Sequence, residues 1–235
     1  MGREKRAGIA SRGTRRRVLL VDDHPVVRKG LVQMIAHTDD LSVCGEAPTA
    51  EDAMTAIAER EPDIVILDIS LPDMNGLDAV RRIKAEHPAL PILVFSVHDE
   101  ALYARRALQA GARGYVMKQE PGECILMAIR KVLQGGYHLS DAVNTSIVRE
   151  LAASEGARHL LRSGVEALSD RELDVFNQIG RGLSPRSIAE RLHLSHRTVL
   201  THRAHIKRKL GASDNAALAR KAVHWVDLET SRTAR

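Results

Sequence analysis

The 235-residue sequence predicts an α/β domain, a doubly wound five-stranded parallel sheet, followed by a small all-α domain. Three observations predict this arrangement. Short apolar runs alternate with stretches of helical periodicity in the first part, and only helical periodicity follows. The third observation is charge: residues 18–162 carry 15 Lys and Arg against 21 Asp and Glu, whereas residues 163–235 carry 13 against eight. An acidic part followed by a basic part indicates two domains with different partners, and the basic one is a candidate for polyanion binding.

Five apolar runs are the expected strands, at residues 17–21, 41–44, 63–67, 91–95 and 114–117. Most of them are continuous and rich in β-branched residues, which is typical of strands buried on both faces of a parallel sheet. Stretches of helical periodicity lie between and after them, near residues 26–37, 50–60, 77–86, 100–110 and 121–134. Strands and helices that alternate in this way imply right-handed crossovers and therefore a doubly wound sheet.

Four of the five expected strands end in polar groups that can do chemistry: Asp22 and Asp23, Asp68, Ser96 and Lys118. Ligands of such sheets bind beyond the carboxyl ends of the strands, so we expect these side chains to converge on one pocket. Three carboxylates repel one another, and a hard cation such as Mg²⁺ relieves that repulsion. With the charge of Lys118 and the hydroxyl of Ser96, the set suits a phosphoryl group, and the central Asp68 is the expected nucleophile.

Three segments, 21–31, 63–77 and 110–118, which contain the three aspartates and Lys118, resemble the receiver domain of two-component response regulators. The resemblance implies a flavodoxin-like fold and a phosphoryl group transferred to Asp68 by a sensor histidine kinase. It implies Mg²⁺ as cofactor, held by Asp22, Asp23, Asp68 and the backbone carbonyl of Ser70. It also implies that Ser96 and Tyr115 are the switch pair and that Lys118 contacts the phosphoryl group. Ser96 stands where most receivers have Thr, and both residues supply a hydroxyl.

The last part of the chain carries the signals of a helix-turn-helix. Ser169, with Glu172 three residues later, predicts a capping box at the start of a helix. Ser184 followed by Pro185 predicts the start of a second helix. Ser195 predicts the start of a third, longer helix that ends before Gly211, and a fourth helix is expected near 214–226. A short helix, a tight turn and a longer helix with basic ends are typical of a protein that reads the major groove of DNA.

The third helix can be divided into an inner and an outer face at about 100° per residue. Val199, His202, Ile206 and Leu210 are expected to face the core. The residues expected to contact DNA are Arg197, Leu200, Thr201, Ala204, Lys207 and Arg208. Basic side chains suit phosphates, and small side chains allow approach to base edges. This part resembles the LuxR-type helix-turn-helix of the NarL/FixJ group, which usually has Lys where this sequence has Leu200.

Together the resemblances imply a DNA-binding response regulator that is phosphorylated on Asp68, forms a homodimer and regulates transcription. The implied partners are a sensor histidine kinase, promoter DNA, a second copy of the chain and RNA polymerase. Its only chemistry would be its own phosphorylation and dephosphorylation. The resemblance also suggests that the unphosphorylated receiver masks the third helix, the recognition helix. The alternative is a Mg²⁺-dependent phosphatase with an aspartyl nucleophile, a class that usually has Asp where this sequence has Ser70.

We expect five segments along the chain: a disordered basic tail (1–16), a receiver domain (17–138), a linker (139–165), a LuxR-type DNA-binding domain (166–228) and a C-terminal tail (229–235). No apolar run reaches the ~18 residues that a membrane span needs, and the first residues lack the apolar stretch of a secretory signal. Cys44 and Cys124 lie in apolar runs and are expected as thiols rather than as a disulfide. We therefore expect a cytoplasmic protein with no membrane partner.

Overall fold

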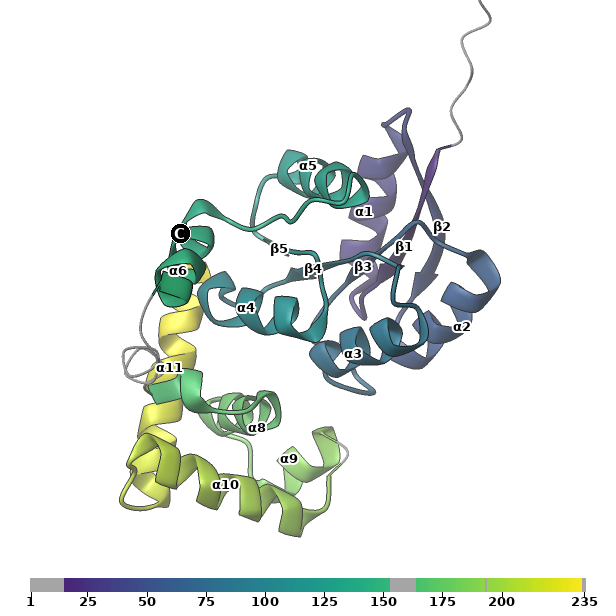
Figure 1. Ribbon diagram of the computed structural model, residues 1–235. Helices are drawn as coiled ribbons and strands as arrows, with labels where there is room; N and C mark the ends of the chain where they lie inside the picture. The colour runs from purple at the N-terminus through teal and green to yellow at the C-terminus, as the bar shows by residue number, and fades with distance from the viewer. Residues whose placement is uncertain (1–14, 153–163, 193, 234–235) are drawn as a thin grey trace, which may run out of the picture.

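A computed structural model describes residues 15–152, 164–192 and 194–233 (Figure 1). The first domain is built on a parallel sheet with strand order β2-β1-β3-β4-β5. The strands are β1 (Arg16–Val21), β2 (Leu41–Ala47), β3 (Ile64–Leu67), β4 (Ile92–Ser96) and β5 (Gly114–Met117). The predicted doubly wound five-stranded sheet is therefore confirmed. Strand β2 extends beyond the expected 41–44, because its pairing with β1 continues to Ala47.

Five helices cover the two faces of the sheet: α1 (Pro25–Ala36), α2 (Ala50–Arg60), α3 (Gly76–Glu86), α4 (Glu100–Ala110) and α5 (Gly122–Leu133). Helices α1 and α5 lie on one face, and α2, α3 and α4 lie on the other (Figure 1). Side chains of β1 alternate between the two cores, with Val18 and Leu20 in one and Leu19 and Val21 in the other. This burial on both faces explains why the strands read as continuous apolar runs.

Helix α6 (Asp141–Ala152) occupies the first half of the expected linker and packs against α4. Leu139 and Val143 are buried, and the backbone N–H of Ser140 donates a 2.8 Å hydrogen bond to Oε1 of Glu100. This stretch is thus part of the first domain's packing rather than a free connection. Residues 153–163 of the expected linker and residues 1–14 of the expected tail lie outside the described residues.

The second domain contains a short 3₁₀ helix η1 (Gly164–Ala167) and four α-helices: α8 (Asp170–Gly180), α9 (Pro185–Arg191), α10 (His196–Leu210) and α11 (Asn215–Thr233). The three predicted caps are confirmed, since the side chains of Ser169, Ser184 and Ser195 each accept a backbone N–H of the helix they begin. In the capping box at Ser169, the backbone N–H of Ser169 also donates a 2.8 Å hydrogen bond to Oε2 of Glu172. Helix α11 continues to Thr233, so most of the expected C-terminal tail is helical.

Two close contacts join α8 to other helices of the second domain, in addition to their shared apolar core. Nζ of Lys209 in α10 donates a 2.5 Å hydrogen bond to Oε2 of Glu172 in α8. This contact joins the capping box to α10. Gly180 lies against α11, where an added Cβ would be 2.4 Å from the carbonyl oxygen of Ala222 and 2.5 Å from Cγ2 of Val226. The close approach of α8 and α11 therefore requires the absence of a side chain at position 180.

We expect Gly180→Ala to lower the free energy of unfolding of the second domain by about 1–3 kcal/mol, because the new Cβ would displace backbone. The matched control is Gly30→Ala in α1, where a Cβ meets nothing within 4 Å. There the loss of backbone freedom in the unfolded chain should raise stability by about 0.5–1 kcal/mol. Urea denaturation followed by circular dichroism measures both changes, and an unchanged stability of Gly180→Ala would contradict the packing of α8 on α11.

Candidate functional site

The polar residues at the strand ends meet in one pocket at the carboxyl edge of the sheet. Asp22 and Asp23 follow β1, Asp68 follows β3 and Lys118 follows β5. The Nζ atom of Lys118 lies 2.6 Å from Oδ2 of Asp22 and 2.8 Å from Oδ2 of Asp68. The side chains of these three residues are 8%, 4% and 1% exposed, in that order. The structure thus brings together groups that lie far apart in the sequence.

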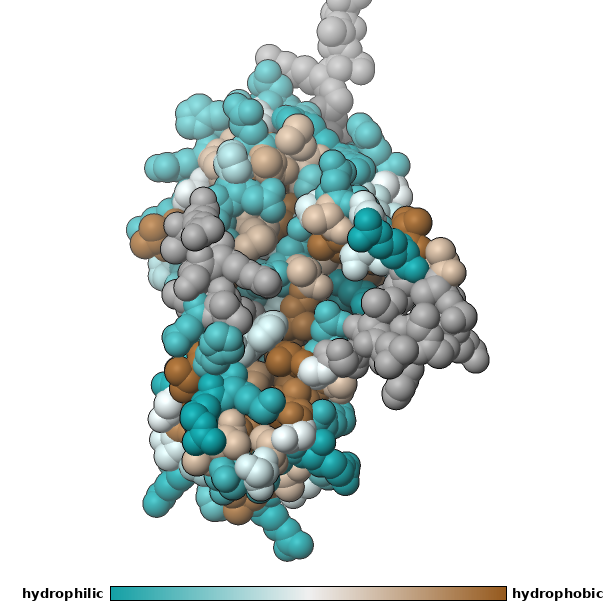
Figure 2. All heavy atoms as spheres, turned by 90° about the vertical axis from the view of Figure 1, so that its left-hand side faces the viewer, coloured by the Kyte–Doolittle hydropathy of each residue, from teal (hydrophilic) through white to brown (hydrophobic). Residues whose placement is uncertain are grey.

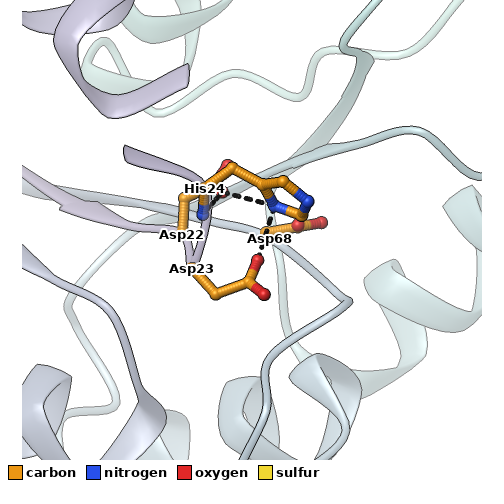
Figure 3. Close-up of side chains that lie close together, drawn as sticks. All are labelled: Asp22, Asp23, His24 and Asp68. Atoms are coloured by element: carbon orange, nitrogen blue, oxygen red, sulfur yellow. Dashed lines mark hydrogen bonds and ion pairs between the residues drawn. The ribbon is translucent and has the colours of Figure 1, made fainter. Parts of the chain in front are cut away.

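An acidic cluster in this pocket fits a hard metal ion. One ligand atom from each of Asp22, Asp23, His24 and Asp68 lies within 4.8 Å of the others (Figure 3). Oδ1 of Asp68 is buried and accepts no hydrogen bond from any described residue. Carboxylate oxygens with free lone pairs, close together, are the donors that Mg²⁺ prefers. The predicted ligands Asp22, Asp23 and Asp68 therefore have a geometry that suits Mg²⁺.

The turn after β1 is held by its own backbone and by one arginine. Oδ1 of Asp22 accepts the backbone N–H of His24 at 2.8 Å, and the carbonyl oxygen of Asp22 accepts Nη1 of Arg28 at 2.6 Å. Nδ1 of His24 lies 2.6 Å from Oδ1 of Asp23. Neither His24 nor Arg28 was expected at this site from the sequence. The position of His24 directly after the acidic pair could have indicated its role. The contact of Arg28 depends on the first turn of α1, which brings its side chain back to Asp22.

Lys118 balances the charge of the buried carboxylates. Burial alone would lower the pKa of an ammonium group, but the negative charges of Asp68 and Asp22 outweigh it and raise the pKa of Lys118 above its ordinary value. Lys118 therefore stays charged at neutral pH, and the pocket contains one fixed cation facing two nearly inaccessible carboxylates.

The predicted switch residues Ser96 and Tyr115 both contact the backbone of His98. The hydroxyl of Tyr115 donates a 2.8 Å hydrogen bond to the carbonyl oxygen of His98, and the N–H of His98 donates to Oγ of Ser96 at 3.4 Å. Burial raises the pKa of Tyr115 well above its ordinary value, so its hydroxyl stays a donor. Ser70 also contacts His98, since Oγ of Ser70 lies 3.1 Å from Nε2 of His98.

His98 is a residue that the sequence analysis missed. Burial lowers the pKa of its imidazole to about 4, so the ring is neutral at neutral pH. The ring stacks on Tyr103 of α4 with a centroid distance of 4.6 Å. Its only sequence signal is its place two residues after Ser96, because burial and stacking depend on α4 folding back over the strand end.

The outer face of α10 is open to solvent. Arg197, Leu200, Thr201, Ala204 and Arg208 are exposed and Lys207 is half-buried, whereas Val199 and Ile206 are buried. The predicted inner face is thus confirmed for Val199 and Ile206, whereas His202 and Leu210, also expected to face the core, are half-buried. The expected masking of the helix is wrong for this conformation, because the first domain makes its hydrogen bonds to α8 and η1.

Known proteins match both domains. Residues 18–130 match the family described as response regulator receiver domain, and residues 166–222 match bacterial regulatory proteins of the luxR family. The oxygen regulatory protein NreC of Staphylococcus epidermidis is 32% identical over 210 residues, covering 88% of this chain and 96% of NreC. The chain belongs to the response regulators that combine a receiver domain with a LuxR-type DNA-binding domain. It is a DNA-binding regulator of transcription, and the phosphatase alternative is not favoured.

Other response regulators support the same assignment over most of the chain. The response regulator GacA of Pseudomonas aeruginosa is 34% identical over 207 residues, covering 88% of this chain and 95% of GacA. The structure of RcsB from Salmonella enterica serovar Typhimurium bound to promoter rprA matches with a TM-score of 0.64. That match covers 88% of this chain and 98% of the RcsB chain at 23% identity, and so it shows a shared fold. Within the described part of this response regulator, every helix is too short or too polar to span a membrane.

We expect Lys118→Met to lower the free energy of unfolding of the receiver domain by about 3–5 kcal/mol at pH 7 without metal, because two buried carboxylates lose their cation. Adding Mg²⁺ should restore part of the loss, since a cation then replaces the ammonium charge. The control is Lys29→Met on the exposed side of α1. Urea denaturation with and without Mg²⁺ measures the effect, and a Lys118 variant as stable as the Lys29 variant would show that Lys118 does not balance the carboxylates.

Proposed function

We propose that Asp68 accepts a phosphoryl group from a sensor histidine kinase. The observation that carries this proposal is that Oδ1 of Asp68 accepts no hydrogen bond from a described residue, while Oδ2 is held by Lys118 at 2.8 Å. Oδ1 thus has no hydrogen bond to a described residue to lose when it attacks phosphorus, while Lys118 fixes the carboxylate. The new P–O bond forms as the P–N bond of the phosphohistidine breaks and the imidazole leaves.

Asp22, Asp23, Asp68 and the backbone carbonyl of Ser70 would hold Mg²⁺. When bound, the ion would neutralise phosphoryl oxygens and offset the repulsion between the carboxylates and the incoming anion. Lys118 provides a second, fixed positive charge on the other side of Asp68. Ser96 provides a hydroxyl donor, and the hydrogen bond of Tyr115 to His98 ties the position of Tyr115 to the segment after β4. Phosphorylation and dephosphorylation of the chain itself are then its only chemistry.

Residues 17–138 would carry this chemistry, and residues 166–228 would bind promoter DNA through Arg197, Leu200, Thr201, Ala204, Lys207 and Arg208. A single helix-turn-helix contacts few base pairs, so a homodimer that reads two half-sites is the expected form on DNA.

Figure 2 looks onto the side of the molecule that carries α6 and α11, where apolar side chains gather in an interrupted strip. Val148 of α6 and Val223 of α11 are 64% and 42% exposed. Exposed apolar side chains on these two helices support a self-association surface, with RNA polymerase a further partner on DNA. A cytoplasmic location remains a prediction.

We expect acetyl phosphate with Mg²⁺ to label Asp68 and no other residue, as detected by mass spectrometry of the borohydride-reduced acyl phosphate. Asp68→Asn should abolish labelling, whereas Asp141→Asn at the exposed start of α6 should leave it unchanged. Chelating the metal should also stop labelling, because the carboxylates then repel the incoming anion. Label that persists in Asp68→Asn would refute the assignment of the acceptor.

We expect Leu200→Lys to tighten binding to all DNA and to steepen the slope of log affinity against log salt by roughly one unit. Leu200 is 46% exposed on the outer face of α10, so a lysine there can reach a phosphate. The outward methyl groups of Thr201 and Ala204 suit the thymine methyl, and the lysine should blur a thymine preference under this helix. Sites selected from random DNA, and scrambled versions of them, serve as the probes.

Arg208→Ala is the companion variant, and it should weaken binding about equally on selected and scrambled sites, as loss of a phosphate contact does. A Leu200→Lys protein with an unchanged salt slope would place position 200 away from the DNA.

A further inference from the structure

One face of α8 is docked on the receiver domain. Nδ2 of Asn75 donates a 2.7 Å hydrogen bond to Oδ1 of Asp174, and Nδ2 of Asn177 donates a 2.9 Å hydrogen bond to the hydroxyl of Tyr103. Asn75 lies in the loop that follows Asp68, and Tyr103 lies in the first turns of α4, after Ser96. The DNA-binding domain therefore holds the two segments that follow the proposed acceptor and the proposed switch serine.

Charge pairs extend the same contact. Asp170, at the first turn of α8, pairs with Nη1 of Arg106 at 2.7 Å and with Arg81. Asp170, Asp174 and Asn177 are spaced four and three residues apart, so they lie on one face of the helix. This face contacts the receiver, while the outer face of α10 is exposed.

The acceptor pocket faces this contact. A cavity of about 260 Å³ lies between the domains, lined on the receiver side by Asp23, Ser70 and His98, and on the other side by α8 and α9 residues that include Arg171, Asp174 and Arg181. Asp68 is 1% exposed and does not line the cavity, whereas Asp23 of the same acidic cluster and Ser70, two residues after Asp68, do. A small phosphodonor fits into a cavity of this size. A protein that brings a phosphohistidine to Asp68 would need the space that α8 fills.

The contact has features of one that opens. Oδ1 of Asn177 and Oε1 of Gln178 are buried without a hydrogen-bond partner among the described residues. Burial raises the pKa of Asp174 to about 7, against the opposing charge of Arg171 and with Asp78 and Asp170 adding to the rise. Docking therefore favours the protonated carboxyl group of Asp174. The stabilisation that Asp174 gives to docking is fully present below the ordinary pKa of a carboxyl group and is lost as the pH rises through about 7. At neutral pH the unpartnered oxygens of Asn177 and Gln178 and the partly charged Asp174 therefore offset part of the free energy gained when α8 is buried on the receiver.

We propose that α8 and a protein phosphodonor compete for the same face of the receiver, so that the DNA-binding domain shields Asp68 from its kinase while α10 stays free. This inference rests on the proposed role of Asp68. In this proposal the receiver is the inhibited domain. When α8 is docked, phosphorylation by a protein donor is slowed, whereas small donors still reach Asp68 through the cavity. By thermodynamic linkage, a kinase that binds this face favours the open form.

A reversible lock tests the competition. Asn75→Cys and Asp174→Cys are introduced together with Cys44→Ala and Cys124→Ala, and the two new thiols are joined by a short bifunctional methanethiosulfonate that dithiothreitol cleaves. The donors are acetyl phosphate and the autophosphorylated kinase core that, in a panel of purified kinases, phosphorylates the wild-type chain fastest. We expect joining to slow transfer from the kinase by at least about tenfold, within the usual range of coupling between sites. Acetyl phosphate labelling should change little, and cleavage should restore the kinase reaction.

The outcomes separate the two proposals. A joined protein that takes phosphate from the kinase as fast as the cleaved protein overturns the competition. Equal slowing with both donors also overturns it, because the lock would then act on the pocket itself rather than on access. If neither donor labels Asp68 of the wild-type chain, it is the proposed function that fails.

A charge reversal tests the same contact without cysteines. Asp170→Lys places a cation opposite Arg81 and Arg106 and should open the domains, raising the rate of transfer from the kinase by about fivefold or more. The matched control is Asp227→Lys, which makes the same charge change on an exposed part of α11. Equal rates in the two variants would contradict the proposal.

Discussion

The contact of Lys118 with Asp22 and Asp68 is the interaction on which the receiver's pocket depends. Two nearly inaccessible carboxylates and a third beside them would repel one another if the ammonium group were absent, and burial would penalise each charge. The ion pairs join the ends of β1, β3 and β5, so the charge balance also holds together the edge of the sheet at which the segments after the strands begin. A pocket built this way holds two buried carboxylates beside one ammonium group.

The segments that leave this edge carry the connection to the second domain. The loop after Asp68 presents Asn75, and the segment after Ser96 presents His98 and Tyr103, and both reach α8. Tyr115 and Ser70 are linked to the same segment through His98. A change at Asp68 that moved these loops would therefore alter contacts with the DNA-binding domain. The coupling is local, because only a few side chains separate the pocket from α8.

Helix α10 depends on a different set of contacts. Its start is capped by Ser195, and its end is joined to α8 through the pair of Lys209 and Glu172. The same α8 that meets the receiver on one face therefore supports α10 within its own domain. The outer face of α10 keeps most of its basic and small side chains exposed, because the contact with the receiver is made by α8.

Patterns of local origin could be read from the sequence alone. Buried strands require continuous apolar runs, helix starts require capping side chains, and helical phase sorts Val199 and Ile206 from Arg197 and Thr201, so these features were predictable residue by residue. The meeting of Asp22, Asp68 and Lys118 was predictable as well, because parallel strands place their carboxyl ends at one edge.

Contacts between distant segments were decided by the tertiary structure. The packing of α6 on α4, the stacking of His98 on Tyr103 and the docking of α8 on Asn75 depend on which surfaces meet when the chain folds. The polar residues of these contacts have the same local signals as residues on a solvated surface. Sequence patterns therefore determined the two domains and the polar residues at the strand ends. Only the folded chain decided that α8 of the DNA-binding domain docks beside the strand-end pocket while the outer face of α10 stays exposed.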